Sequence, residues 1–227
     1  MSRGEHVTGE FKLERQKTML QLALDMTDIN VALEIVDLVS PYFEILEVGT
    51  PLILSAGVKA VETLNAKYPQ KIILADLKIA DAGDYEATIA YEAGADLVTV
   101  LGLADCRTIQ GAVTAGKRFS RGVVVDSLNM NDLKSFAVQL ENLGVACILV
   151  HAGTDGTHRA MALSAQITAI VGCSSLPVAV AGGITPQNVG PLIQSGASIF
   201  VAGSSVTQSA DPRQVAELLR NKVFGRY

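Results

Sequence analysis

Long apolar runs, paired cysteines and clustered basic residues are all missing from this sequence. No stretch approaches the roughly 20 consecutive apolar residues that cross a bilayer, so no membrane segment is expected. The chain of 227 residues carries 18 Lys and Arg against 23 Asp and Glu. This acidic balance argues against a nucleic-acid partner, which would select clustered cations. The cysteines fit neither a zinc spacing nor an even disulfide framework, which is typical of reduced thiols in a cytoplasmic protein; they are Cys106, Cys147 and Cys173.

A secretory signal is also lacking from the start of the sequence. The first 17 residues are polar and contain no apolar stretch. We therefore expect a cytoplasmic protein in which residues 1–17 form an N-terminal tail that is dispensable or weakly ordered. Residues 18–227 form the predicted catalytic domain, because no linker or change of composition interrupts them.

From residue 18 onward, the sequence alternates regularly between short aliphatic runs and amphipathic stretches. The cycle repeats about every 25 residues, as expected of βα units. Hydrophobic residues make up 49% of the chain and charged residues 18%, which suits parallel strands covered on both faces. Eight runs are predicted to be strands, at 19–25, 43–49, 71–78, 96–102, 121–127, 146–153, 177–183 and 198–204.

Helix start and stop signals lie between these runs. Pro186 is expected at a first helical position. Gly94, Gly144 and Gly196 follow predicted helix ends, where a residue with left-handed backbone is favoured. The residues expected to cap helix N-termini are Asp28, Asp81, Asp132 and Thr185.

Eight strands that alternate with helices predict a single-domain α/β protein, the (β/α)8 TIM barrel. The alternative is an open doubly wound sheet, which usually carries a glycine-rich phosphate turn after its first strand. Here that place reads ALDMTD, without glycine, whereas glycines follow the last two runs. Barrels of this class bind phosphate after their seventh and eighth strands, so the pattern favours the barrel.

Ionisable residues gather at the carboxyl ends of the predicted strands. In a parallel barrel these ends share one rim, which is the active-site face. A single Asp at a strand end is more often a helix cap, but several carboxylates on one rim repel one another unless a cation or a paired base offsets them. Glu47 and Asp76 are hard oxygen ligands on neighbouring strands and predict a Mg²⁺ site. The rim residues are Asp25, Glu47, Asp76, Lys78, Asp126 and His151.

Two glycine turns follow the last two predicted strands. AGGITPQNV holds Gly182 and Gly183, and VAGSSV holds Gly203 and Ser204. Glycine lets the backbone approach an anion closely, and the amides at a helix N-terminus bind it. The sequence therefore predicts that these residues bind the phosphate group of a substrate.

A series of short motifs connects these residues to a known family. In order, the chain reads LALD, EVGTPLI, ADLKIADAG, AGADLVTVLG, GVVVD, HAGTD, VAGGI and VAGS. With this order and spacing it resembles the 3-hexulose-6-phosphate synthase family of the orotidine-5′-monophosphate decarboxylase superfamily, from about Met19 to Arg220. The D-x-K-x-x-D element is the superfamily signature, and here it consists of Asp76, Lys78 and Asp81.

The resemblance implies a reaction. It is the Mg²⁺-dependent, reversible aldol addition of formaldehyde to D-ribulose 5-phosphate, which passes through an enediolate. Glu47 and Asp76 would hold the metal, and His151 would be the general base that removes a proton from C1. Lys78 would stabilise the developing oxyanion, kept protonated by the acidic residues beside it.

The resemblance also implies a homodimer with shared active sites. Asp81 would reach into the site of the partner subunit, whereas its simpler role is that of a helix N-cap. Asp25 and Asp126 are expected to orient substrate hydroxyls or Lys78.

Other functions remain open. A 3-keto-L-gulonate-6-phosphate decarboxylase shares the Glu, the signature and the His, but typically reads His-Arg-x-Arg-Asp after the sixth strand and carries an Arg in its last phosphate turn. This chain reads HAGTD from His151 and has Ser204 after Gly203, which favours the synthase. The pyrimidine-nucleotide decarboxylase needs no Mg²⁺ and would leave Glu47 unexplained. A non-catalytic phosphosugar-binding barrel would lack the acid–base residues that are present here.

Overall fold

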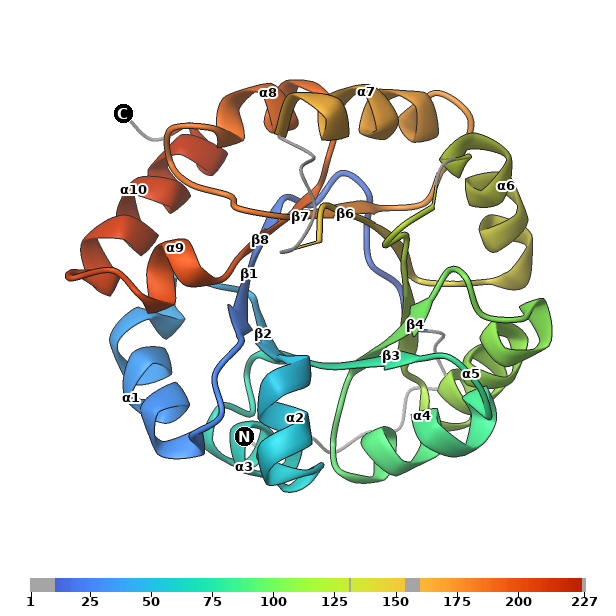
Figure 1. Cartoon of the computed structure of the whole chain (residues 1–227), viewed down its shortest axis with the longest axis horizontal. Helices are drawn as coiled ribbons and strands as arrows, with labels where there is room; N and C mark the ends of the chain where they lie inside the picture. Colours follow the sequence, from blue (N-terminus) through green and yellow to red (C-terminus); the bar gives the residue numbers. More distant parts are fainter. Residues whose placement is uncertain (1–10, 131, 154–159, 226–227) are drawn as a thin grey trace.

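Eight parallel strands close into a barrel in the computed structural model, which describes residues 11–130, 132–153 and 160–225. Each strand pairs with its neighbours in chain order, and β8 returns to pair with β1, so the predicted TIM barrel is confirmed. Helices surround the ring of strands (Figure 1). The strands are β1 Met19–Leu24, β2 Ile45–Val48, β3 Ile72–Ile79, β4 Leu97–Leu101, β5 Gly122–Asp126, β6 Cys147–His151, β7 Val178–Ala181 and β8 Ile199–Ala202.

Alternation along each strand divides its side chains between the barrel interior and the surrounding helices. In β1, Leu22 and Leu24 join the apolar cluster that lies under the helices. Met19 and Ala23 join a second cluster inside the barrel. Two residues beyond Ala23, the same alternation brings Asp25 to the mouth of the barrel.

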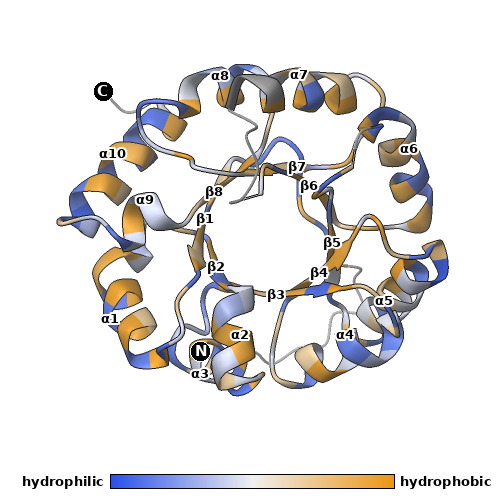
Figure 2. Ribbon diagram, in the orientation of Figure 1, coloured by the Kyte–Doolittle hydropathy of each residue, from blue (hydrophilic) through white to orange (hydrophobic). Residues whose placement is uncertain are grey.

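The helices turn their apolar sides toward the strands and their polar sides outward (Figure 2). Such one-sided patterning is typical of a helix that packs on a core. The helices are α1 Ile29–Val39, η1 Ser40–Tyr42, α2 Thr50–Ala56, α3 Lys59–Lys67, α4 Gly83–Glu92, α5 Cys106–Phe119, α6 Leu133–Leu143, α7 Ala160–Val171, α8 Val189–Gln194, α9 Ser204–Thr207 and α10 Pro212–Phe224.

Several predicted helix ends are confirmed. Asp28 and Asp132 are the N-caps of α1 and α6, and their carboxylates accept hydrogen bonds from backbone amides. The glycines predicted after helix ends all have the left-handed backbone that such ends favour; they are Gly94, Gly144 and Gly196.

The predicted start of α8 is wrong. The helix begins at Val189, and Thr185 and Asn188 form a reciprocal pair one turn earlier. The amide of Thr185 donates to Asn188 Oδ1 at 2.8 Å, and the amide of Asn188 donates to Thr185 Oγ1 at 3.3 Å. Thr185 therefore caps a turn that leads into the helix, and Pro186 lies in that turn.

Residues 11–17, which fall within the predicted tail, lie against the N-terminal end of the barrel. Phe11 and Leu13 pack against the cluster inside the strands. Arg15 donates hydrogen bonds to the carbonyl oxygens of Val171, at 2.8 Å, and Ser174, at 2.6 Å. Part of the predicted tail thus packs with the domain, while residues 1–10 lie outside the described residues.

Arg15→Ala should lower the free energy of unfolding by about 1–3 kcal/mol, because two charge-assisted hydrogen bonds at the end of α7 are lost. The kcat should not change, because Arg15 lies at the end of the barrel opposite the rim. Chemical denaturation would measure the loss. Lys59→Ala is the matched control: it removes only the surface ion pair with Glu62 and should change stability by less than about 1 kcal/mol. Equal stability of the two variants would show that Arg15 does not hold the segment in place.

None of the helices within the described ranges has both the length and the apolar character that a bilayer crossing requires. Cys106, Cys147 and Cys173 are free thiols. Cys147 is buried in the interior cluster, where a thiol packs as a small apolar group.

Candidate active site

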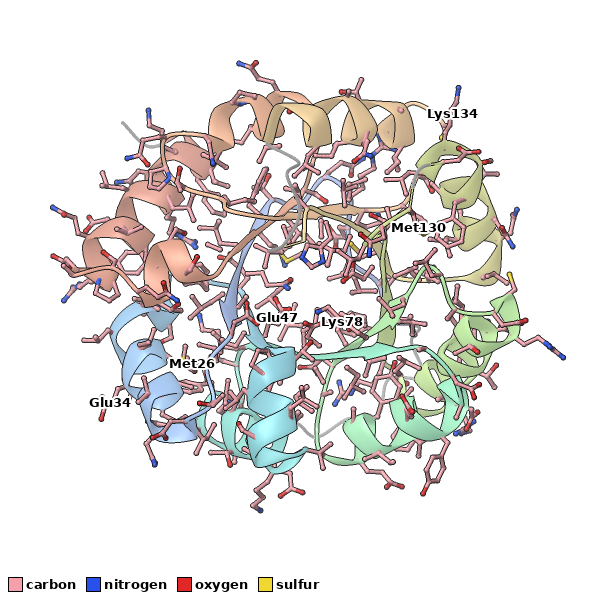
Figure 3. All side chains as sticks on the ribbon, in the orientation of Figure 1. Met26, Glu34, Glu47, Lys78, Met130 and Lys134 are labelled. Atoms are coloured by element: carbon pink, nitrogen blue, oxygen red, sulfur yellow. The ribbon has the colours of Figure 1, made fainter. Side chains whose placement is uncertain are left out.

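The predicted rim residues lie together at the carboxyl ends of the strands. Glu47 and Asp76 lie within β2 and β3, and His151 is the last residue of β6. Figure 3 shows Glu47 and Lys78 pointing into the middle of the ring of strands, whereas Glu34 points outward from α1. The prediction of one shared rim therefore agrees with the structure.

Glu47 is a carboxylate enclosed by the barrel wall, with 6% of its surface exposed. Gln21 Nε2 donates a hydrogen bond to Glu47 Oε2 at 2.7 Å. Burial first, and then the nearby Asp76 carboxylate, raise the pKa of Glu47 to about 8, although the hydrogen bond from Gln21 works in the opposite direction. At neutral pH this carboxyl group is therefore largely protonated unless a cation lies beside it.

Asp76 and Lys78 form an ion pair between Asp76 Oδ2 and Lys78 Nζ. Burial lowers the pKa of Lys78, but the charge and hydrogen bond of Asp76, with smaller effects from Asp126 and Glu47, outweigh it and raise this pKa overall. Lys78 is therefore a permanently charged ammonium group in the mouth of the barrel.

Asp25 reaches the same mouth from the end of β1. A Cβ on Gly49 would lie 2.2 Å from Asp25 Oδ1, so only glycine at position 49 leaves room for this carboxylate. Partial removal from water and the charge of Asp76 raise the pKa of Asp25, and Lys78 and His151 lower it to a smaller extent. Asp25 thus interacts electrostatically with Asp76, Lys78 and His151.

His151 and Asp126 form a hydrogen-bonded pair. His151 Nδ1 lies 2.9 Å and 3.1 Å from the two oxygens of Asp126, and the amide of Leu128 donates to Asp126 Oδ1 at 2.9 Å. Because a carboxylate can only accept, Nδ1 carries the proton and the lone pair of the neutral ring is on Nε2. The Asp126 side chain is fully buried. Asp126 therefore orients His151, which differs from the prediction that it orients substrate hydroxyls or Lys78.

Asp81 lies at the outer edge of the rim and is exposed. The prediction that Asp81 is the N-cap of α4 is wrong, because Ala82 occupies that position, with a φ of 50°. Asp81 Oδ1 instead accepts a hydrogen bond from the amide of Ala82 at 2.8 Å. Its carboxylate borders an open hollow that Tyr85 and Arg107 also line.

The two glycine turns directly follow β7 and β8, which are neighbours in the barrel. Gly182 has φ +126°, and a Cβ there would lie 2.7 Å from the carbonyl oxygen of Ala152, so the turn requires glycine. Ser205 Oγ donates to the carbonyl oxygen of Ile184 at 2.6 Å and joins the two turns. Gly203 precedes Ser204, the first residue of α9, so backbone amides of this turn face the same end of the barrel as the rim residues.

Within the described ranges, no group of three or more His, Cys, Asp or Glu side chains has the arrangement of a complete metal site. Glu47 and Asp76 nevertheless fit a Mg²⁺ ion, which commonly takes one or two carboxylates and completes its shell with water and substrate oxygens. Burial and, to a smaller extent, the nearby charge of Asp76 raise the pKa of Glu47, and a bound cation would offset both effects by favouring the ionised carboxylate.

Three side chains in the site escaped sequence prediction. Gln21 bonds Glu47, and Thr50 and Thr99 both bond Asp76. Gln21 could have been found, since it lies four residues before Asp25 on the same side of the strand. Thr99 in LVTVL looks like an ordinary β-branched strand residue, and Thr50 looks like a helix start. Their hydrogen bonds to Asp76 can be recognised only once the structure places them beside β3.

The sequence and the fold are both similar to those of known enzymes. Residues 18–219 match the orotidine 5′-phosphate decarboxylase / HUMPS family. The 3-hexulose-6-phosphate synthase of Methylomonas aminofaciens is 39% identical over 199 residues, which cover 87% of this chain and 95% of the relative. A crystal structure of a 3-hexulose-6-phosphate synthase superposes with a TM-score of 0.87 at 38% identity, and the match covers 91% of this chain and 100% of that structure. The 3-keto-L-gulonate-6-phosphate decarboxylase of Vibrio cholerae superposes with a TM-score of 0.81 at 25% identity, covering 93% and 100%.

Proposed function

Because the chain belongs to the orotidine 5′-phosphate decarboxylase / HUMPS family, we propose that it is an aldehyde-lyase that adds formaldehyde reversibly to D-ribulose 5-phosphate. The product is 3-hexulose 6-phosphate. One observation carries the proposal: a histidine base held by Asp126 and an ammonium group held by Asp76 share one barrel mouth. The likeness of the chain to several enzymes of this name supports the choice of substrate.

Each residue has a defined task in this reaction. His151 Nε2 removes a proton from C1 of ribulose 5-phosphate, which gives the cis-enediolate. Lys78 donates a hydrogen bond to the oxygen that gains negative charge. C1 then forms a bond to the carbon of formaldehyde, and the resulting alkoxide takes back a proton from His151.

The remaining residues bind and orient the substrate. We assign its phosphate group to the backbone of Gly182, Gly183, Gly203 and Ser204, whose turns follow the neighbouring strands β7 and β8. Asp25 lies near the second turn, with Oδ2 3.5 Å from the position of a Cβ on Gly203, and would accept hydrogen bonds from sugar hydroxyls. The reacting end of the sugar then lies over Lys78 and His151.

Glu47 and Asp76 would hold Mg²⁺. The ion, when bound, supplies positive charge that stabilises an enediolate. Removing the metal with a chelator should therefore abolish turnover, and added Mg²⁺ should restore it. Full turnover by a verified metal-free sample in excess chelator would contradict the metal assignment.

The raised pKa of Glu47 gives this prediction a second readout. Mg²⁺ binds the ionised carboxylate, and Glu47 ionises only as the pH approaches about 8. The affinity for Mg²⁺ should therefore increase between about pH 6 and pH 8, with release of a proton near pH 7. Calorimetry in two buffers of different ionisation enthalpy would count the proton, and Glu47→Gln should remove metal binding altogether.

We further propose a homodimer in which two subunits build each active site. Asp81 is exposed and makes its hydrogen bond to the amide of Ala82, while Lys78 pairs with Asp76. The hollow beside Asp81 carries the exposed ring of Tyr85, which is 71% exposed. A second copy that covers this surface would bury the ring and bring its own Asp81 to the Lys78 of this subunit.

The second candidate is decarboxylation of 3-keto-L-gulonate 6-phosphate, which would pass through the same enediolate. The structural likeness to the decarboxylase from Vibrio cholerae supports it, but Ala152 and Ser204 stand where the decarboxylases carry arginine. Purified protein should form hexulose phosphate from ribulose 5-phosphate and formaldehyde, and release little CO₂ from the keto acid. The opposite preference would make the chain a decarboxylase.

We place the protein in the cytoplasm, where its sugar-phosphate substrate and its reduced thiols would both persist. The three cysteines are free, and such thiols are typical of a reducing compartment. This assignment agrees with the proposed activity on a small metabolite.

A further inference from the structure

The pair of Asp76 and Lys78 lies on a distorted part of β3. The pairing with β4 loses its regular register between Ala75 and Ile79. Lys78 itself has φ 48°, a left-handed backbone that a residue with a Cβ adopts at a cost. Such a conformation persists only where neighbouring groups hold it, so the structure must contain a group that fixes Lys78.

That group is the hydroxyl of Thr99 on the neighbouring strand β4. The backbone amide of Lys78 donates to Thr99 Oγ1 at 2.8 Å. The same hydroxyl donates to Asp76 Oδ1 at 2.7 Å. A hydroxyl has a single hydrogen to donate, and here it goes to the carboxylate while the oxygen accepts the amide. Thr99 thus fixes the backbone of the lysine and the side chain of the aspartate at the same time.

Thr50 holds the pair from the opposite side. Thr50 Oγ1 lies 2.7 Å from Asp76 Oδ2 and 2.8 Å from the carbonyl oxygen of Asp76. Lys78 Nζ donates to Thr50 Oγ1 at 3.1 Å. The two oxygens of Asp76 therefore have different neighbours: Thr99 on Oδ1, and both Thr50 and Lys78 on Oδ2. Rotation of the carboxylate would break bonds on both sides.

Thr99 is only 1% exposed and cannot contact a substrate in the mouth of the barrel. We propose that Thr99 is a positioning residue, whose hydroxyl sets the directions of the Asp76 carboxylate and the Lys78 ammonium group for the reaction. The inference rests on the proposed function only in assigning the chemistry to Lys78. The valine side chain has the same shape as threonine without the hydroxyl, so Thr99→Val removes both hydrogen bonds and little packing.

The kinetic test uses full-length Thr99→Val and Thr99→Ser. Thr99→Val should lower kcat about 10- to 100-fold, as loss of supporting hydrogen bonds does in comparable sites. The KM for the sugar phosphate should change less than about threefold, since the phosphate turns are untouched. Thr99→Ser keeps the hydroxyl and should retain most of kcat. The matched control is Thr114→Val, which removes a hydroxyl that donates to the carbonyl oxygen of Gln110 on α5, and kcat should not change.

A second readout needs no substrate. The Lys78 amide should be protected from hydrogen exchange in the wild type and in Thr99→Ser, and should exchange at least about tenfold faster in Thr99→Val, because it has lost its acceptor. Exchange is followed by NMR on ¹⁵N-labelled protein. This result stands even if the chain prefers another sugar phosphate, and kcat is then measured on the substrate that the enzyme does turn over.

If Thr99→Val does not fold, Thr99→Ala replaces it as the hydroxyl-free variant in both the kinetic and the exchange measurements. A folded hydroxyl-free variant with wild-type kcat, or with a protected Lys78 amide, would overturn the proposal. So would a Thr99→Ser variant as slow as the hydroxyl-free one, because the hydroxyl would then not be the group that acts.

Discussion

A mixture of two inactive variants, Lys78→Ala and Asp81→Ala, should recover about a quarter of wild-type activity. Each variant alone should lose at least about 10²-fold in kcat, because in the proposed mechanism Lys78 stabilises the oxyanion and the Asp81 of the partner subunit completes the active site. With free exchange of subunits about half of the dimers are mixed, and one of the two sites in each then has both residues. Steady-state assays of the mixture, after incubation that allows exchange, measure the recovery.

Native mass spectrometry must show that mixed dimers have formed. A control mixture of Lys78→Ala with Asp76→Asn should recover no activity, because both changes affect the same side of a site and no subunit arrangement restores it. If verified Lys78→Ala and Asp81→Ala heterodimers remain inactive, Asp81 acts within its own subunit, where its carboxylate accepts the amide of Ala82.

Asp126→Asn should lower kcat by about 10²- to 10⁴-fold while the protein stays folded. The carboxylate of Asp126 accepts a hydrogen bond from His151 Nδ1 at 2.9 Å, which leaves the lone pair on Nε2, the proposed base. A carboxamide of the same shape can turn its NH₂ toward the ring, which favours the tautomer with the proton on Nε2 and removes the base. The kcat and the melting temperature of the variant, measured together, test this expectation.

Glu141→Gln is the matched control for this substitution. Glu141 also uses its carboxylate for local hydrogen bonds, to Ser174 and Ser175, but these lie away from the rim. Its kcat should remain at the wild-type value. An Asp126→Asn variant with nearly normal turnover would show that the tautomer of His151 does not matter and that another group is the base.

The barrel and its rim could be predicted from sequence because both follow from local periodicity. Parallel strands buried on both faces require aliphatic runs, and the runs recur along the chain with a helix between them. The polar residues that end these runs, such as Asp25 and His151, can be assigned to one rim without knowledge of any distance. The position of a residue at a strand end determines where its side chain lies, and for Glu47 this position was sufficient to assign it to the rim.

The partner of each side chain could not be predicted in the same way. Asp126 looked like a residue that faces substrate, but it is covered by its neighbours and bonds His151 from the adjacent strand. Thr99 acts on Lys78 only because β3 leaves its regular register there. Two apolar residues among polar ones show no periodicity, so sequence alone places Phe11 and Leu13 in a tail, although they pack on the barrel.

Exchange of hydrogen for deuterium at C1 of ribulose 5-phosphate tests most directly whether this rim forms an enediolate. The protein is incubated in D₂O with ribulose 5-phosphate and Mg²⁺, without formaldehyde, and C1 is followed by NMR. If His151 removes a C1 proton, deuterium should replace a single C1 hydrogen stereospecifically, and His151→Asn should abolish the exchange. Absence of deuterium at C1 in a sample that converts ribulose 5-phosphate once formaldehyde is added, or undiminished exchange by His151→Asn, would contradict it.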